Sequence, residues 1–166
     1  MELKSITFDS GPAGNHYYHQ WPSQRPIGWL HIMHGMAEHS ARYADIAAFL
    51  SQQGIMVTAG DHRGHGRTGD AMDSLYHLGD SNSWNQMIDD QWQLIHHIAA
   101  EHNLPLVIMG HSMGSFMATR FCQEYGYRLQ QQLNNRLVGL VLSGSNYDSP
   151  PAFKVAAAVA WIERLR

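Results

Sequence analysis

The residues around Ser112 constrain the fold more than any other part of the sequence. The apolar run PLVIMG (residues 105–110) predicts a buried strand, and apolar residues at helical spacing follow it. Gly110, Ser112 and Gly114 fall in the turn between strand and helix as a G-x-S-x-G pattern. Glycines two residues before and after the serine let neighbouring backbone pass without a Cβ clash, and such a turn lifts the hydroxyl above the edge of a sheet. We therefore interpret Ser112 as a candidate nucleophile.

Apolar strands and amphipathic helices alternate along the rest of the chain. This alternation predicts an α/β fold with a mostly parallel, doubly wound sheet that is covered by helices on both faces. Ser83 and Gln86 have capping-box spacing and predict the start of a long helix. The first two strands are separated by proline and glycine, so we expect them to extend the sheet in antiparallel fashion. The expected strands are residues 3–8, 16–21, 27–33, 55–59, 105–110 and 137–142.

Composition excludes several classes of protein. With 11 Lys and Arg against 14 Asp and Glu, the chain has no basic excess to neutralise nucleic-acid phosphates. Its hydrophobic share of 44% indicates a packed domain and not a disordered chain. Cys122 is the single cysteine, so no internal disulfide is available. The longest apolar run, residues 155–162, is too short for a membrane span, and MELKSITFDS lacks a signal-peptide core. We expect a soluble, cytoplasmic protein of undetermined oligomeric state.

Two backbone N–H groups are candidates to stabilise negative charge near Ser112. An acyl-transfer enzyme needs donors for the oxyanion that forms on the attacked carbonyl. Met113 follows the serine at the start of a helix, where N–H groups and the helix dipole favour negative charge. The segment His34-Gly35-Met36 follows the strand at residues 27–33, and Gly35 would let its loop approach the substrate. We expect the Met36 N–H to supply the second donor.

A glycine-rich loop, GDHRGHGRTG, follows the strand at residues 55–59. Its glycines permit a tight turn, and Asp61 and Arg63 have the charges to pin it by charge-assisted hydrogen bonds. We assign these two residues a supporting role, and we interpret His62 and His65 as histidines of the loop and not as metal ligands.

The motifs HGMAEHSARY, GDHRGHGRTG and GHSMGS occur in this order and together resemble the α/β-hydrolase superfamily. Within it they are similar to the monoacylglycerol lipase and lysophospholipase branch, which is related to serine aminopeptidase-type hydrolases. The resemblance covers residues 27–147. It implies that Ser112 attacks an ester carbonyl and that the N–H groups of Met36 and Met113 form the oxyanion hole. It also implies a small lipid-like ester as substrate, with no cofactor and no metal. The supporting residues are His34, Gly35, Gly110, His111, Gly114, Asp61 and Arg63.

The sequence departs from this family after the nucleophile. A hydrolase of this type needs an acid and then a histidine after the serine, yet none of the 12 histidines follows Ser112. The acids after Ser112 are Glu124, Asp148 and Glu163. Glu124 belongs to the helix after the serine, and Asp148 follows the last strand, where some other α/β-hydrolases place the acid. The family resembled here places it one strand later.

We therefore expect the chain to be the N-terminal part of a longer hydrolase. Residues 1–149 would form the truncated core, and residues 150–166 would begin a helical cap. The acid and the histidine would lie beyond the chain, which alone would be catalytically incompetent. The amphipathic segment 153–162 is compatible with an apolar acyl channel or with transient contact at a membrane surface.

Other functions remain open from the sequence. A carboxylesterase, a thioesterase or a peptidase could use the same fold, and a non-catalytic pseudo-hydrolase acting as a binding module would need no histidine. A metal protein is the alternative that the histidine content suggests. The pairs His16/His19 and His31/His34 lie three apart on expected strands, so their side chains point to opposite faces. We expect no metal site.

Overall fold

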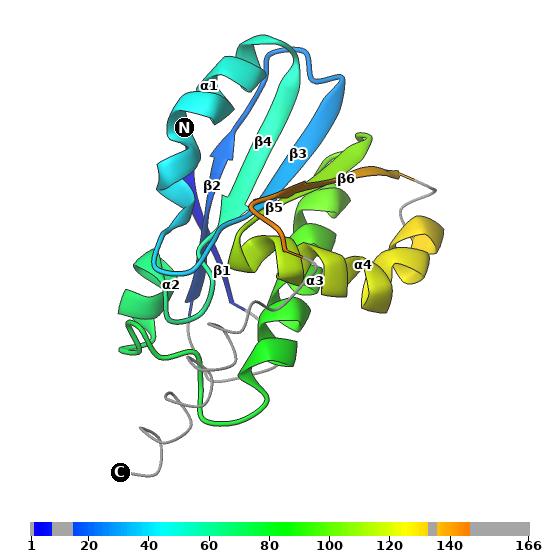
Figure 1. Ribbon diagram of the computed structural model, residues 1–166. Helices are drawn as coiled ribbons and strands as arrows, with labels where there is room; N and C mark the ends of the chain where they lie inside the picture. Colours follow the sequence, from blue (N-terminus) through cyan, green and yellow to red (C-terminus); the bar gives the residue numbers. More distant parts are fainter. Residues whose placement is uncertain (1, 8–14, 133–135, 147–166) are drawn as a thin grey trace.

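The computed structural model describes residues 2–7, 15–132 and 136–146. Within these residues the chain forms a six-stranded sheet in the order β1-β2-β4-β3-β5-β6 (Figure 1). The strands are β1 (Glu2–Thr7), β2 (Asn15–Trp21), β3 (Gly28–Met33), β4 (Ile55–Gly60), β5 (Leu106–His111) and β6 (Leu137–Ser143). The helices are the short η1 (Ser40–Tyr43), α1 (Ala44–Gln52), α2 (Gly66–Ala71), α3 (Ser83–Glu101) and α4 (Met113–Gln132).

The sheet is mixed, as the sequence predicted. Strands β4, β3, β5 and β6 run parallel, and β2 pairs antiparallel with both β1 and β4. The chain passes from β3 to β4 on one side and then crosses back to β5 on the other side. In open α/β sheets a ligand binds at such a switch point, beyond the carboxyl ends of the strands. Here that place lies between the ends of β3 and β5.

The two faces of the sheet bury separate apolar clusters. Residues on β3 alternate between the faces, as a strand requires. Ile32 packs with Val57 and Ala47 beneath α1, whereas Trp29 packs on the opposite face with residues of α3 and α4, including Phe121. Figure 1 shows α3 and α4 side by side and α1 on the other side of the sheet. This double cover confirms the predicted doubly wound architecture.

The glycine-rich loop contains a helix that the sequence pattern did not predict. Helix α2 begins inside it at Gly66, where the Asp61 carboxylate accepts a hydrogen bond from the Arg67 N–H at 2.8 Å. A carboxylate at the first turn satisfies an N–H that has no partner within the helix. Asp61 thus stabilises the start of α2 from five residues upstream of it.

The capping-box prediction for α3 was wrong. Asn82 occupies the cap position with a left-handed φ of 53°, and it makes no side-chain cap hydrogen bond. The Gln86 side chain, expected to complete the box, instead accepts a hydrogen bond from Arg63 Nη1 at 2.7 Å. Gln86 therefore pairs with Arg63, which is distant in sequence, and not with the backbone at the start of α3.

Two features expected from the sequence lie outside the described residues: the cap at residues 150–166 and the candidate acid Asp148. Among the residues that the structure describes, no helix combines the length and apolar character needed to cross a membrane.

Candidate active site

Ser112 lies in the turn between β5 and α4 and is exposed, as the sequence predicted. Its φ is +51°, a left-handed conformation that is strained for a residue with a side chain. Hydrogen bonds on both sides hold it there: the Ser112 N–H donates to the Ser143 carbonyl, and the Ser112 carbonyl accepts from the Ser115 N–H, each at 2.8 Å. The Ser115 hydroxyl donates to the same carbonyl at 2.6 Å. The backbone is thus fixed while the Ser112 hydroxyl makes no hydrogen bond to the described residues.

The glycines on either side of Ser112 are required by close contacts. A Cβ on Gly110 would lie 2.6 Å from Ser115 Cα and would overlap the Gly114 carbonyl. A Cβ on Gly114 would lie 2.6 Å from the His34 carbonyl oxygen and would overlap the Met33 carbonyl. The start of α4 therefore packs directly on the end of β3, so the turn that bears Ser112 lies against the loop that begins at His34.

The loop after β3 also touches the serine. A Cβ on Gly35 would lie 3.2 Å from Ser112 Cβ and 3.3 Å from the His111 carbonyl oxygen. The absence of a side chain at Gly35 lets its peptide approach the nucleophile. The next N–H along the chain is that of Met36.

Hydrogen bonds around this loop leave the Met36 N–H available. The Gly35 N–H donates to Glu38 Oε1 at 2.5 Å, and the Ala37 N–H donates to His65 Nε2 at 3.3 Å. Between them the Met36 N–H has no partner within the described residues. The Met113 N–H, at the first position of α4, also lacks one there, as expected for a helix start. Two N–H groups without a described partner are therefore found here, one on Met113, which follows Ser112, and one on Met36, which follows the Gly35 that contacts Ser112.

Glu38 is a residue of the site that the sequence pattern did not single out. Its carboxylate also accepts a hydrogen bond from the Tyr43 hydroxyl at 2.9 Å and pairs with Arg42 Nε at 2.9 Å. These contacts join the loop to the start of η1 and α1. The sequence does contain a signal for this role: Glu38 lies three residues after Gly35, the spacing at which an acidic side chain reaches back to a backbone N–H in a capping box.

Among the residues that the structure describes, no histidine makes a hydrogen bond to the Ser112 hydroxyl. His34 stacks on His62 with ring centroids 3.9 Å apart, and His65 lies 5.2 Å from His34. Both ring nitrogens of each of these three residues already have partners. His111 uses Nδ1 to contact the Ser143 hydroxyl at 3.2 Å. Burial lowers the pKa of His34 to about 4, so this imidazole is neutral at pH 7.

Asp61 and Arg63 hold the glycine-rich loop, although they contact different partners and not each other. Asp61 Oδ1 accepts hydrogen bonds from the Ser40 N–H at 2.7 Å and from the Ser40 hydroxyl at 2.6 Å. Arg63 reaches across to α3 and binds Asp90 through Nε at 2.7 Å and Nη2 at 2.8 Å. Both Arg63 and Asp90 are almost fully buried, so this bidentate pair ties the loop to the core.

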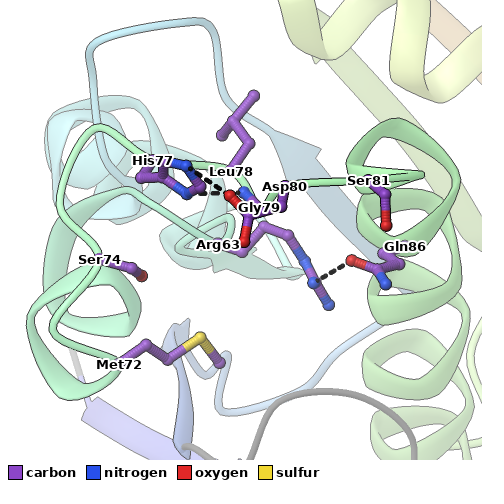
Figure 2. Close-up of a pocket in the computed structure, with 9 residues that line it drawn as sticks. All are labelled: Arg63, Met72, Ser74, His77, Leu78, Gly79, Asp80, Ser81 and Gln86. Atoms are coloured by element: carbon purple, nitrogen blue, oxygen red, sulfur yellow. Dashed lines mark hydrogen bonds and ion pairs between the residues drawn. The ribbon is translucent and has the colours of Figure 1, made fainter.

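A cavity of about 340 Å³ adjoins this loop but does not reach the serine. Figure 2 shows the Arg63 side chain across it, hydrogen-bonded to Gln86, with His77 and Asp80 in contact on another side. Its lining includes neither Ser112 nor Met36. It is therefore separate from the place where an acyl group would react. Among the described residues no group of three His, Cys, Asp or Glu side chains could hold a metal ion.

A model of the hydrolase family described as serine aminopeptidase, S33, matches residues 24–166, which is most of the chain. The chain belongs to this family. The monoacylglycerol lipase of Mycolicibacterium smegmatis is 36% identical to this S33-type hydrolase over 110 residues, 65% of this chain and 37% of that protein. Phospholipase YtpA of Bacillus subtilis is 31% identical over 123 residues, 74% of this chain and 42% of that protein. The human monoglyceride lipase is 30% identical over 144 residues, 82% of this chain and 42% of that protein.

Solved structures agree with this assignment. A thermostable carboxyl esterase from Bacillus coagulans, in complex with glycerol, is similar with a TM-score of 0.79 and 27% identity, covering 99% of this chain and 51% of that one. A soluble variant of the monoglyceride lipase of Saccharomyces cerevisiae has a TM-score of 0.67 at 24% identity, covering 99% and 50%, and shows the shared α/β-hydrolase fold. The S33-type chain spans about half of these structures and about two fifths of the curated relatives.

Proposed function

We propose that this chain is the nucleophile-bearing part of a serine hydrolase that cleaves acyl esters of the monoacylglycerol or lysophospholipid class. The observation that carries the proposal is the exposed Ser112 at φ +51°, together with the N–H groups of Met36 and Met113, which have no described partner. The substrate class is supported by the relatives named monoacylglycerol lipase and phospholipase.

The chemistry follows from these groups. Ser112 Oγ attacks the ester carbonyl as a base removes its proton, and a tetrahedral intermediate forms. Its oxyanion accepts hydrogen bonds from the Met36 and Met113 N–H groups, and the N-terminus of α4 adds a favourable dipole. When the intermediate collapses, the protonated base gives its proton to the departing alkoxide. A base-activated water then releases the acyl group from Ser112.

The base and its acid partner would be a histidine and a carboxylate outside this chain. The sequence has no histidine after Ser112, and the histidines beside it have both ring nitrogens engaged or contact Ser143. Without a base the Ser112 hydroxyl stays protonated at neutral pH and is a poor nucleophile. We therefore expect the isolated chain to be inactive.

The test is an ester panel on the whole protein that contains this chain. Monoacylglycerols, lysophosphatidylcholines and simple p-nitrophenyl esters of increasing acyl length separate a lipase from a short-chain carboxylesterase. Ser112→Ala is expected to lower kcat by about 10⁴-fold or more, whereas Ser81→Ala, an exposed serine on a loop, leaves it unchanged. If the protein prefers thioesters or peptides, the proposed substrate class is wrong, but Ser112 remains the proposed nucleophile. Hydrolysis by Ser112→Ala at the wild-type rate would refute the proposal.

A non-catalytic binding role is the second candidate, favoured by the lack of a histidine after Ser112. It predicts that the whole protein binds a lipid ester without turning it over. Flotation of the whole protein with liposomes tests the further expectation of contact at a membrane surface.

A further inference from the structure

A continuous row of hydrogen bonds begins in the core between the sheet and α3. The Trp29 indole N–H donates to the Thr58 hydroxyl at 2.7 Å, and that hydroxyl is 2.8 Å from His31 Nδ1. His31 Nε2 lies 2.9 Å from Gln91 Oε1. All four side chains are buried, so no water competes for these groups.

The row continues from α3 to the oxyanion loop. Gln91 Nε2 lies 3.3 Å from His62 Nδ1, and His62 Nε2 lies 3.1 Å from the His34 carbonyl oxygen. The His62 main-chain N–H donates to His34 Nε2 at 3.0 Å. His34 Nδ1 then lies 2.8 Å from the Gly35 carbonyl oxygen. Seven hydrogen bonds thus join Trp29 to the peptide after Gly35.

The chemistry of the two ends fixes the direction of every bond in this row. A carbonyl only accepts, so His62 Nε2 carries the proton and His62 Nδ1 must accept from the Gln91 amide. The Gln91 oxygen then faces His31, whose Nε2 must be the protonated nitrogen, and His31 Nδ1 accepts from the Thr58 hydroxyl. The Trp29 indole only donates, which agrees with a Thr58 oxygen that accepts from it. The same reasoning puts the His34 proton on Nδ1, because His34 Nε2 accepts from a backbone N–H.

The last hydrogen bond of the row, from His34 Nδ1, reaches the peptide between Gly35 and Met36, which carries the proposed oxyanion donor. The Gly35 carbonyl and the Met36 N–H belong to one planar trans peptide, so they point in opposite directions. A hydrogen bond from His34 Nδ1–H to that carbonyl therefore fixes the direction of the Met36 N–H. It also polarises the peptide and strengthens the N–H as a donor.

We propose that His31 and Gln91 are positioning residues: Gln91, held by His31, fixes the His62 ring against the His34 carbonyl, and this contact keeps the oxyanion loop in the conformation that directs the Met36 N–H toward the oxyanion. This inference rests on the proposed function of Ser112. Neither residue contacts the nucleophile turn through a described hydrogen bond, and both act through His62. Gln91 is the central link because its amide supplies an acceptor to one histidine and a donor to the other.

The tautomers can be measured without any catalysis. Long-range ¹H–¹⁵N spectra of the chain at pH 7.5 distinguish Nδ1–H, Nε2–H and doubly protonated imidazole. We expect Nε2–H for His31 and His62 and Nδ1–H for His34. A His34 proton on Nε2, or a charged His31 or His62, would overturn the proposal. The wild-type spectrum needs no variant, so it decides this point even where a substitution prevents folding.

The perturbation is Gln91→Glu, which keeps the shape but removes the donor to His62. The expected result is a second proton on His62, read as a doubly protonated ring at pH 7.5. In the whole protein kcat falls about tenfold or more while KM stays within about twofold, since misplaced catalytic groups affect the reacting state most. Asn85→Asp is the matched control, because it makes the same amide-to-acid change on the exposed side of α3.

The two proposals fail in different ways. Unchanged His62 protonation and unchanged kcat in Gln91→Glu overturn the positioning role while Ser112→Ala remains inactive. Full activity in Ser112→Ala overturns the proposed function, and with it the purpose assigned to the row of hydrogen bonds. A fall in activity in Gln91→Glu that is matched by Asn85→Asp also overturns the positioning role, because it would reflect added charge.

Discussion

Buried neutral histidines should make this protein unusually sensitive to mild acid. Burial lowers the pKa of His16, His31 and His34 to about 4, because the charged imidazolium loses its hydration. In the unfolded chain each histidine binds a proton near pH 6.5. The unfolded state therefore binds more protons between about pH 6.5 and 4, and the free energy of unfolding falls as the pH falls through that window.

The size of the effect follows from the two pKa values. Each pKa unit is worth about 1.4 kcal/mol. Relative to neutral pH, each of the three histidines therefore lowers the free energy of unfolding by about 2 kcal/mol at pH 5 and by about 3 kcal/mol near pH 4. Together they remove about 6 kcal/mol at pH 5, which is comparable to the whole stability of an ordinary domain. Burial also holds the pKa of His62 well below its usual value, and it acts in the same direction.

Urea unfolding followed by circular dichroism at pH 7.5, 6.5, 5.5 and 5 measures this loss. His31→Gln should reduce the slope of unfolding free energy against pH by about 1.4 kcal/mol per pH unit, since one buried titrating group is gone. His96→Gln, which replaces an exposed histidine on α3, is the control for the substitution itself. Stability that changes by less than about 1 kcal/mol between pH 7.5 and 5 would refute the reasoning.

Two further predictions concern packing and charge. Gly114→Ala should lower the unfolding free energy by about 3 kcal/mol or more, because its Cβ would overlap the Met33 carbonyl. Gly126→Ala, on the same helix, should raise it by about 0.5–1 kcal/mol, because a Cβ there meets only Cys122 Cβ at 4.0 Å, an ordinary contact distance. Equal effects of the two substitutions in urea unfolding would contradict the contacts described. Asp90→Ala should lower the free energy of unfolding by about 3–5 kcal/mol, because the buried Arg63 guanidinium loses its carboxylate partner and keeps only its hydrogen bond to Gln86. Adding Arg63→Met should recover most of that loss, and a double variant no more stable than Asp90→Ala would count against the ion pair as its cause.

Local patterns in the sequence predicted most of the fold. The apolar runs at β3, β4 and β5 and the G-x-S-x-G turn around Ser112 predicted a parallel sheet with the serine at its edge. These features depend on residues close together in the chain, where periodicity and glycine sterics decide. The left-handed cap at Asn82 was missed because the Gln86 side chain has a better partner in Arg63, which is distant in sequence.

The supporting hydrogen bonds of the site could not be predicted in the same way. His31 and Gln91 lie 60 residues apart, and each sits on an element that the sequence marks only as buried. A buried polar residue needs a partner, but the sequence does not say which one the packing will supply. The histidine content suggested a metal protein, whereas in the structure several of these side chains pair with backbone and with one another.

Labelling by a fluorophosphonate tests the central claim most directly, because the reagent reacts only with an activated serine. We predict one label on Ser112 in the whole protein, lost in Ser112→Ala, and no comparable labelling of the isolated 166-residue chain, whose histidines are engaged elsewhere. Rapid, stoichiometric labelling of Ser112 in the isolated chain would contradict this claim, since the base would then lie within these residues.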